Sequence, residues 1–244
     1  MNTRGWIAPA LLVLALCAAT ARPAAAQLNW TIVGVGEVDT EEVVLALASV
    51  SASPGGSGWS PIGGVHVSWL KYPISSTDDR QIISIVPSVG VRNGFDGGSF
   101  QFRVGYAFRE SNDDDEDVAV GVPPVAADIR DDGLVNAAQV DYWGNGNLNA
   151  QLIGSYNYGS EFLWSRARLT QKIFDLSGSG HVRAGGEAAY LNGEDYDAWQ
   201  VGGVVGFHAG GGTIINAGVG RKLAIGEGND ATYFRAEIVL NPGN

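Results

Sequence analysis

One histidine and one serine stand where they could act together in catalysis. His66 and Ser68 are separated by one residue within a predicted β-strand, so their side chains point to the same face. An imidazole beside a hydroxyl can act as the general base for a serine nucleophile. This pair supports one alternative for the protein, a lipid- or glycan-modifying enzyme. The other histidines, His181 and His208, have no carboxylate or cysteine at the spacing of a metal site, so neither a metal nor a cofactor is expected.

A second set of side chains consists of charges on the polar face of predicted strands. If the strands close into a barrel, these charges point into its lumen, where opposite charges should pair because an unpaired buried charge is costly. Two interpretations stay open: a plug of salt bridges that only stabilises the barrel, or a small channel open to anions or sugars. Arginine exceeds carboxylate in this set, which predicts a residual positive field. The predicted lumen charges are Arg103, Arg109, Asp141, Arg166, Arg168, Arg183, Glu187, Arg235 and Glu237.

The segment Ser99–Arg109 shows why a barrel is expected. Its even positions are apolar and mostly aromatic, and its odd positions are polar or small. A period of two indicates a β-strand with two unlike faces. A soluble sandwich would bury the aromatic face, whereas a transmembrane barrel presents it to lipid and keeps small and charged residues inside. The barrel is the favoured interpretation, and a soluble β-domain is the alternative.

The same two-faced pattern recurs in Leu148–Tyr158, Leu163–Ile173 and Thr232–Leu240, and no segment has a convincing helical period. The sequence therefore predicts an all-β fold, an antiparallel up-and-down transmembrane β-barrel of about 10–12 strands. The expected strands are Thr31–Thr40, Val43–Ser53, Ile62–Ile74, Ile82–Phe95, Ser99–Ser111, Leu134–Trp143, Leu148–Tyr158, Phe162–Ile173, His181–Leu191, Ala198–Ala209, Thr213–Ala224 and Ala231–Leu240.

The connections between these strands alternate in character. Tight turns at Asp96-Gly97-Gly98, Asn145-Gly146-Asn147 and Gly210-Gly211-Gly212 follow even-numbered strands, and longer acidic connections follow odd-numbered ones. Outer-membrane barrels have short periplasmic turns and longer outer loops, so the alternation fits that class. Two connections depart from it: Pro54–Pro61 is long for a periplasmic turn, and Gly159–Glu161 is short for an outer loop.

The longest connection, Asn112–Gly133, is rich in carboxylates. Oxygen ligands of this kind suit calcium, but no calcium-loop spacing is present. We expect a solvated outer loop without a metal. Its acidic residues are Asp113, Asp114, Asp115, Glu116, Asp117, Asp128, Asp131 and Asp132.

The N-terminus predicts export. Residues 1–26 combine Arg4, a short apolar core and Ala24-Ala25-Ala26 as a cleavage site, which leaves residues 27–244 as one β-barrel domain. No later stretch approaches about 20 uninterrupted apolar residues, the length of a membrane helix. Cleavage removes two of the 15 basic residues and none of the 26 acidic ones, so the mature formal charge is −13. No basic patch is left to neutralise phosphates, which argues against nucleic acid as a partner.

The C-terminal half resembles the BcsS family of bacterial cellulose-biosynthesis accessory proteins, over roughly Asn136 to Leu240. The resemblance implies an outer-membrane barrel with a role beside exopolysaccharide synthesis or export, and it brings no known catalytic residues. The run His66-Val67-Ser68 is also similar to the histidine and serine of outer-membrane lipid A deacylases. The motifs shared with the BcsS family are Asp141-Tyr142-Trp143, Gly154-Ser155-Tyr156, Ser165-Arg166-Ala167-Arg168-Leu169, Gly186-Glu187-Ala188 and Asn192-Gly193-Glu194-Asp195-Tyr196-Asp197-Ala198-Trp199.

Together these observations predict a non-enzymatic β-barrel of the outer membrane, and the resemblance to the BcsS family implies that it assists exopolysaccharide (cellulose) synthesis or export. Its expected partners are outer-membrane lipid and polysaccharide or the secretion machinery. The alternatives are a barrel-borne lipid- or glycan-modifying enzyme and a soluble periplasmic β-rich binding module.

Overall fold

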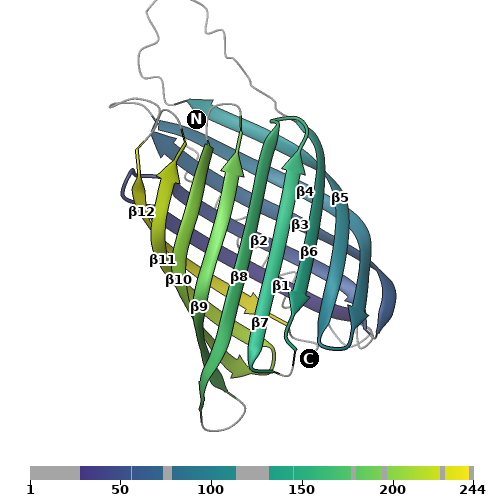
Figure 1. Ribbon diagram of the computed structural model, residues 1–244. Coiled ribbons are helices and arrows are strands. Elements are labelled where there is room, and N and C mark those ends of the chain that lie inside the picture. Colours follow the sequence, from purple (N-terminus) through teal and green to yellow (C-terminus); the bar gives the residue numbers. More distant parts are fainter. Residues whose placement is uncertain are drawn as a thin grey trace, which may run out of the picture.

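The computed structural model describes residues 28–55, 57–73, 79–113, 132–144, 146–176, 180–193, 197–225 and 229–241. The predicted export signal, residues 1–26, and most of the acidic connection lie outside these residues. The described chain forms twelve strands (Figure 1). They are β1 (Leu28–Asp39), β2 (Val44–Pro54), β3 (Gly58–Pro73), β4 (Asp79–Phe95), β5 (Gly98–Asp113), β6 (Gly133–Tyr142), β7 (Leu148–Asn157), β8 (Phe162–Asp175), β9 (His181–Asn192), β10 (Asp197–Gly210), β11 (Thr213–Ala224) and β12 (Ala231–Leu240).

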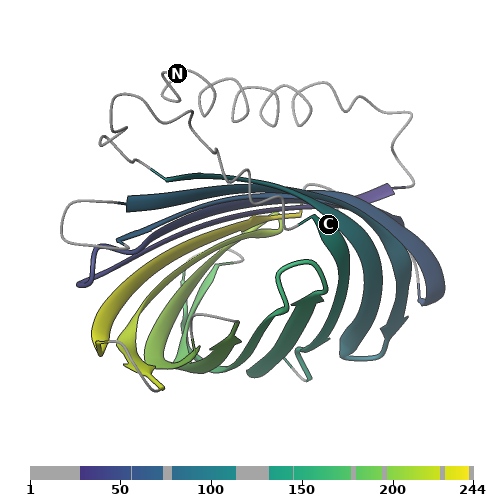
Figure 2. The same cartoon turned by 90° about the horizontal axis from the view of Figure 1, so that it is seen from above.

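The strands form a closed antiparallel barrel. Each strand pairs with its neighbours in sequence, and β1 closes the sheet against β12 with Glu37 in register with Arg235. Closure satisfies every strand edge, which a membrane requires because lipid offers no hydrogen bonds. The view along the barrel shows a flat wall of purple and blue N-terminal strands facing a curved wall of green ones (Figure 2). The predicted up-and-down barrel is therefore confirmed, with twelve strands. Within the described ranges no helix is long and apolar enough to cross a membrane.

The turns divide the two ends of the barrel as predicted. The turns after β4, β6 and β10 contain Gly97, Gly146 and Gly211, each with positive φ (73°, 86° and 57°), which glycine adopts without strain. By the short-turn rule this end faces the periplasm, and the opposite end, with the β5–β6 connection, faces outward. One expectation was wrong in detail: the connection predicted at Pro54–Pro61 is short, because β3 already begins at Gly58.

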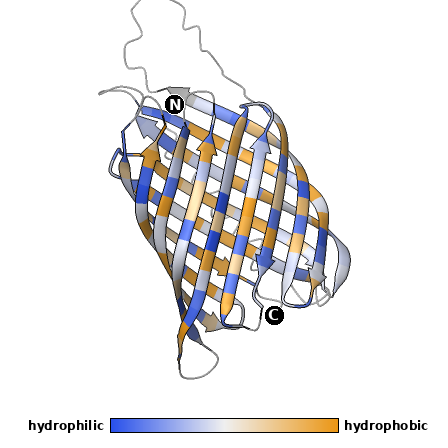
Figure 3. Ribbon diagram, in the orientation of Figure 1, coloured by the Kyte–Doolittle hydropathy of each residue, from blue (hydrophilic) through white to orange (hydrophobic). Residues whose placement is uncertain are grey.

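Apolar and polar residues alternate along the strands (Figure 3), and the alternation separates the two faces of the wall. On β5, Phe102 and Phe108 are exposed on the outer surface (39% and 52%). Ala107, which lies on the opposite face of the strand, is fully buried. On β12, Phe234 is exposed while Arg235 is buried. The predicted facing of the apolar residues toward lipid is confirmed on these strands.

The facing of β5 makes a testable prediction. Phe102→Arg places a guanidinium on the lipid-facing surface and should destabilise the barrel by about 2–4 kcal/mol if the site lies near the membrane midplane. Gln101→Leu, one residue away on the lumen face, should be tolerated much better. The measurement is the fraction of protein that shifts mobility on boiling after refolding into vesicles. Equal damage from both substitutions would contradict the facing assignment.

Candidate functional site in the barrel lumen

The centre of the lumen is an ion-pair network that crosses between strands distant in sequence. Arg168 on β8 contacts Glu187 on β9 (Nη2 to Oε2, 2.8 Å) and Glu237 on β12 (Nη1 to Oε1, 2.6 Å). Arg166, two residues earlier, donates from Nη1 to the other oxygen of Glu237 at 2.9 Å. All four side chains are buried. Since β8 and β12 are not neighbours in the sheet, these contacts span the interior of the barrel.

The network continues from Glu187 toward β1. Arg235 on β12 donates from Nη1 to Glu187 at 2.6 Å and from Nε to Glu37 at 2.8 Å. Lys222 on β11 then bridges Glu37 (3.7 Å) and Asp39 (2.5 Å). Four cations therefore meet four carboxylates, which lets this part of the lumen bury its charges without an excess of either sign.

A relay of amides extends the network in the other direction. Gln151 on β7 accepts from Arg166 Nη2 at 2.7 Å and donates to Asp141 Oδ1 at 2.8 Å. The second oxygen of Asp141 accepts from Gln139 Nε2 at 2.7 Å, and Gln139 Oε1 accepts from Gln101 Nε2 at 2.7 Å. The hydrogen bonds thus reach β5, where the relay ends on Gln101.

Glycines make room for the network. Tyr233 is fully buried, and its ring lies against Gly202 on β10 and Gly220 on β11, which are in register. A Cβ at residue 202 would lie 2.4 Å from the Tyr233 hydroxyl, and a Cβ at residue 220 would lie 2.8 Å from its Cε1. The hydroxyl donates to Glu187 Oε1 at 3.3 Å. The tyrosine ring therefore fills the space that side chains at Gly202 and Gly220 would occupy, and it contacts the network at Glu187.

Sequence reasoning did not single out part of this network. Glu37 and Asp39 on β1, Lys222 on β11 and the amide of Gln200, which contacts both Glu37 and Arg235, were not among the predicted lumen charges. A weak signal was present, because Glu37 and Asp39 are two positions apart and so share the face of β1 opposite to Val38. The same face carries Val33 and Val35, which hides its polar character.

Arg183 is placed apart from the ion pairs, at the periplasmic end. Its guanidinium donates to the carbonyl oxygens of Asn147 (3.3 Å) and Gly146 in the β6–β7 turn, and from Nε to His181 Nε2 at 3.1 Å. The His181 ring stacks on His208 with 4.4 Å between centroids. This cluster joins a turn to the lumen wall. Among the described residues no group of three or more His, Cys, Asp and Glu side chains could hold a metal.

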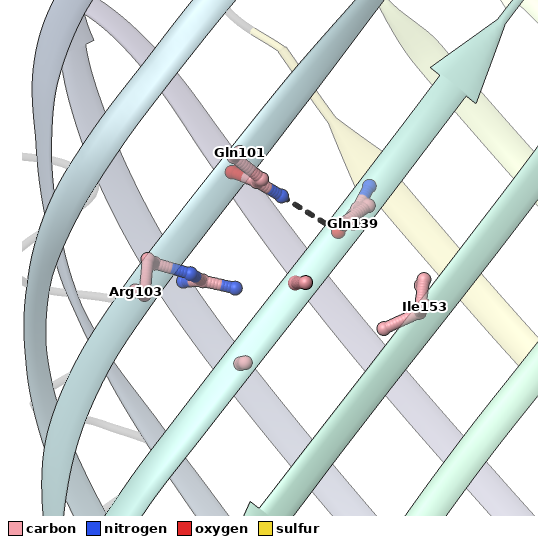
Figure 4. A pocket seen from close by; sticks show the side chains of 6 residues that line it. Gln101, Arg103, Gln139 and Ile153 are labelled. Carbon is pink, nitrogen blue, oxygen red and sulfur yellow. Dashed lines mark hydrogen bonds between the residues drawn. The ribbon is translucent and has the colours of Figure 1, made fainter.

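The remaining predicted lumen charges, Arg103 and Arg109, lie on the opposite wall. Arg103 faces the lumen beside Gln101, Gln139 and Ile153 (Figure 4). The backbone N–H of Arg109 donates to Asp132 Oδ1 at 2.8 Å, which ties the outer end of β5 to the residue before β6. The other acidic residues of that connection lie outside the residues whose side chains the structure describes.

His66 and Ser68 both lie on the lumen side of β3. Val65, between the lumen positions of that strand, is exposed on the outer surface, and Ile62 on the same side as His66 is buried. In register, His66 is opposite Ser49 and Ser68 is opposite Ser84. A lipid in the surrounding membrane meets the other face of this strand.

The sequence matches no protein-family model, and no curated protein matches it. Its fold is similar to solved autotransporter barrels. The β-domain of the Bordetella autotransporter Brka has a TM-score of 0.53 and 12% identity, covering 88% of this chain and 98% of that chain. The transport unit of AIDA-I from Escherichia coli has a TM-score of 0.51 and 11% identity, and the match covers 91% of each chain. The translocator domain of NalP from Neisseria meningitidis has a TM-score of 0.50 and 13% identity, and the match covers 96% of this chain and 95% of that chain. The protein is a twelve-stranded β-barrel of the bacterial outer membrane.

Proposed function

We propose that the protein is a non-enzymatic barrel that passes small anionic solutes across the outer membrane in support of exopolysaccharide secretion. The observation that carries the proposal is the unequal charge of the two lumen walls. The network side pairs four cations with four carboxylates on β8, β9, β11, β12 and β1. Through Ser111, the described lumen face of β2 to β5 carries Arg92 and Arg103 and no Asp or Glu.

Hydroxyl groups accompany those arginines. Small polar side chains keep this wall thin and offer hydrogen bonds to a hydrated solute, whereas the long side chains of the network fill the other side. A residual positive field between walls of low dielectric concentrates anions. The hydroxyl-bearing side chains are Ser49, Ser51 and Ser53 on β2, Ser60 and Ser68 on β3, Ser84 and Ser88 on β4, and Ser99 on β5.

The absence of enzymatic activity is part of the proposal. The orientation of His66 and Ser68 into the lumen supports it, because a lipid A deacylase must meet its substrate at the membrane. The exopolysaccharide role is supported by the resemblance of residues 136–240 to the BcsS family. Deletion of the gene should lower secreted exopolysaccharide and leave the mass spectrum of lipid A unchanged. A lipid A species lost on deletion would favour the enzyme alternative instead.

Liposome swelling tests the passage itself. Vesicles that contain the refolded barrel should admit glucuronate faster than the cationic glucosamine, with neutral glucose between them, because Arg92 and Arg103 place positive charge on the described lumen wall. Boiled protein is the matched control for leakage. Equal rates for the three sugars, or faster entry of glucosamine, would contradict the proposal.

A further inference from the structure

Two arginines, Arg92 and Arg103, lie side by side on the lumen wall opposite the ion-pair network. Arg92 on β4 alternates with the outward Val91, and Arg103 on β5 alternates with the outward Phe102 and Val104. Within the described part of the chain, neither arginine makes an ion pair or a side-chain hydrogen bond. Every cation of the central network, by contrast, contacts at least one carboxylate.

Gln101 lies between these two arginines. Its Cα is in register with Arg92, and Arg103 is two positions along the same strand, so the three side chains share one patch of the wall. Gln101 donates one N–H to Gln139 Oε1 (2.7 Å), and the amide relay thereby fixes its orientation (Figure 4). In the part of the chain that the structure describes, its carbonyl oxygen and second N–H make no side-chain hydrogen bond and are left for another partner.

Among the described residues no carboxylate contacts the guanidinium of Arg92 or Arg103. The register neighbours of Arg103 are Gly90 on β4 and Ala137 on β6, which are too small to reach a guanidinium. A Cβ at residue 90 would lie 1.9 Å from the carbonyl oxygen of Phe102, so this close approach of two strands requires glycine there. Both oxygens of Asp141 are engaged by Gln139 and Gln151. Asp141 therefore acts on Arg92 only through space, without a direct contact, and Arg103 faces the lumen with no carboxylate of the described residues in contact.

We propose that Arg92, Gln101 and Arg103 form a binding subsite for a sugar acid, in which the arginines hold the carboxylate and Gln101 holds an adjacent hydroxyl. The inference rests on the proposed function, since the passage must admit the sugar. A guanidinium fork matches the two oxygens of a carboxylate, and a charge-assisted bond of this kind is stronger than a neutral one. A simple anion would satisfy the arginines but not the amide, so hydroxyls beside the carboxylate should add affinity.

Isothermal titration of the refolded barrel in detergent tests the subsite with three probes: D-glucuronate, D-glucose and acetate. Glucuronate should bind more tightly than acetate, and glucose should bind weakest. Arg103→Gln should weaken glucuronate binding about tenfold or more, because it removes a charged donor. Gln101→Leu should reduce the preference for glucuronate over acetate. Arg221→Gln is the matched control, since Arg221 is exposed near the outer rim and should leave binding unchanged.

The outcomes separate this inference from the proposed function. Saturable glucuronate binding without entry into liposomes would overturn the passage and support the subsite. Entry without binding, or an Arg103→Gln barrel that binds as the parent does, would overturn the subsite alone. Equal binding of acetate and glucuronate would show an adventitious anion site only. If Arg103→Gln does not refold, Arg103→Lys keeps the charge without the fork and should still weaken binding.

Discussion

Glu237→Ala should destabilise the folded barrel by about 3–5 kcal/mol, because it leaves buried guanidiniums without their carboxylate. Glu237 accepts from Arg166 at 2.9 Å, from Arg168 at 2.6 Å and from Asn216 Nδ2 at 2.7 Å. Arg168 keeps Glu187, whereas Arg166 keeps only the Gln151 amide. The free energy of unfolding from urea titration in phospholipid vesicles, followed by tryptophan fluorescence, measures the loss.

An exposed ion pair provides the control for this prediction. Lys172 and Asp175 contact at 3.1 Å on β8, with the Asp175 side chain 70% exposed. Asp175→Ala should therefore change the free energy of unfolding by about 1 kcal/mol or less. If Glu237→Ala were no more harmful than Asp175→Ala, the network would not be a closely paired, buried structure.

Tyr233→Ala should have an effect of similar size, about 3–5 kcal/mol, because a fully buried ring is replaced by a cavity over two glycines. Tyr233→Phe keeps the ring and loses only the hydrogen bond to Glu187, so its loss should stay near 1 kcal/mol. Both values come from the same urea titration.

The glycines beneath Tyr233 give an independent check. Gly202→Ala should destabilise the barrel by about 1–3 kcal/mol because its Cβ overlaps the tyrosine and the backbone of Val219. Gly203→Ala is the matched control: it is the next residue on the same strand, and its Cβ would meet nothing closer than 3.9 Å. Equal effects of the two alanines would mean that Tyr233 does not occupy the space above Gly202.

The strands could be predicted because their two faces differ so much. On β5 and β12 the apolar residues fall on every second position, and the same alternation places Arg235 and Glu237 on the lumen side. The turn glycines at Gly97 and Gly211 mark where strands reverse. Local patterns of this kind depend only on neighbouring residues, so one sequence is enough to see them.

The pairing inside the lumen depends on the stagger of the closed sheet, which no local pattern carries. Glu37 and Arg235 are 198 positions apart and meet only because β1 closes on β12. Likewise, Arg103 and Arg166 look alike in the sequence, yet Arg166 contacts a carboxylate, whereas no carboxylate of the described residues contacts Arg103. The two arginines differ in their contacts because the register and curvature of the closed sheet determine which strands face each other across the lumen.

The reversal potential of the pure barrel in a planar bilayer under a potassium chloride gradient tests the central claim most directly. The positive charge of Arg92 and Arg103, opposite a neutral network, predicts a small conductance that prefers chloride, and Arg92→Gln with Arg103→Gln should bring that preference close to zero. Arg221→Gln, at the exposed rim, should leave it unchanged. A conductance that prefers potassium, or no conductance at all, would contradict this account of the lumen.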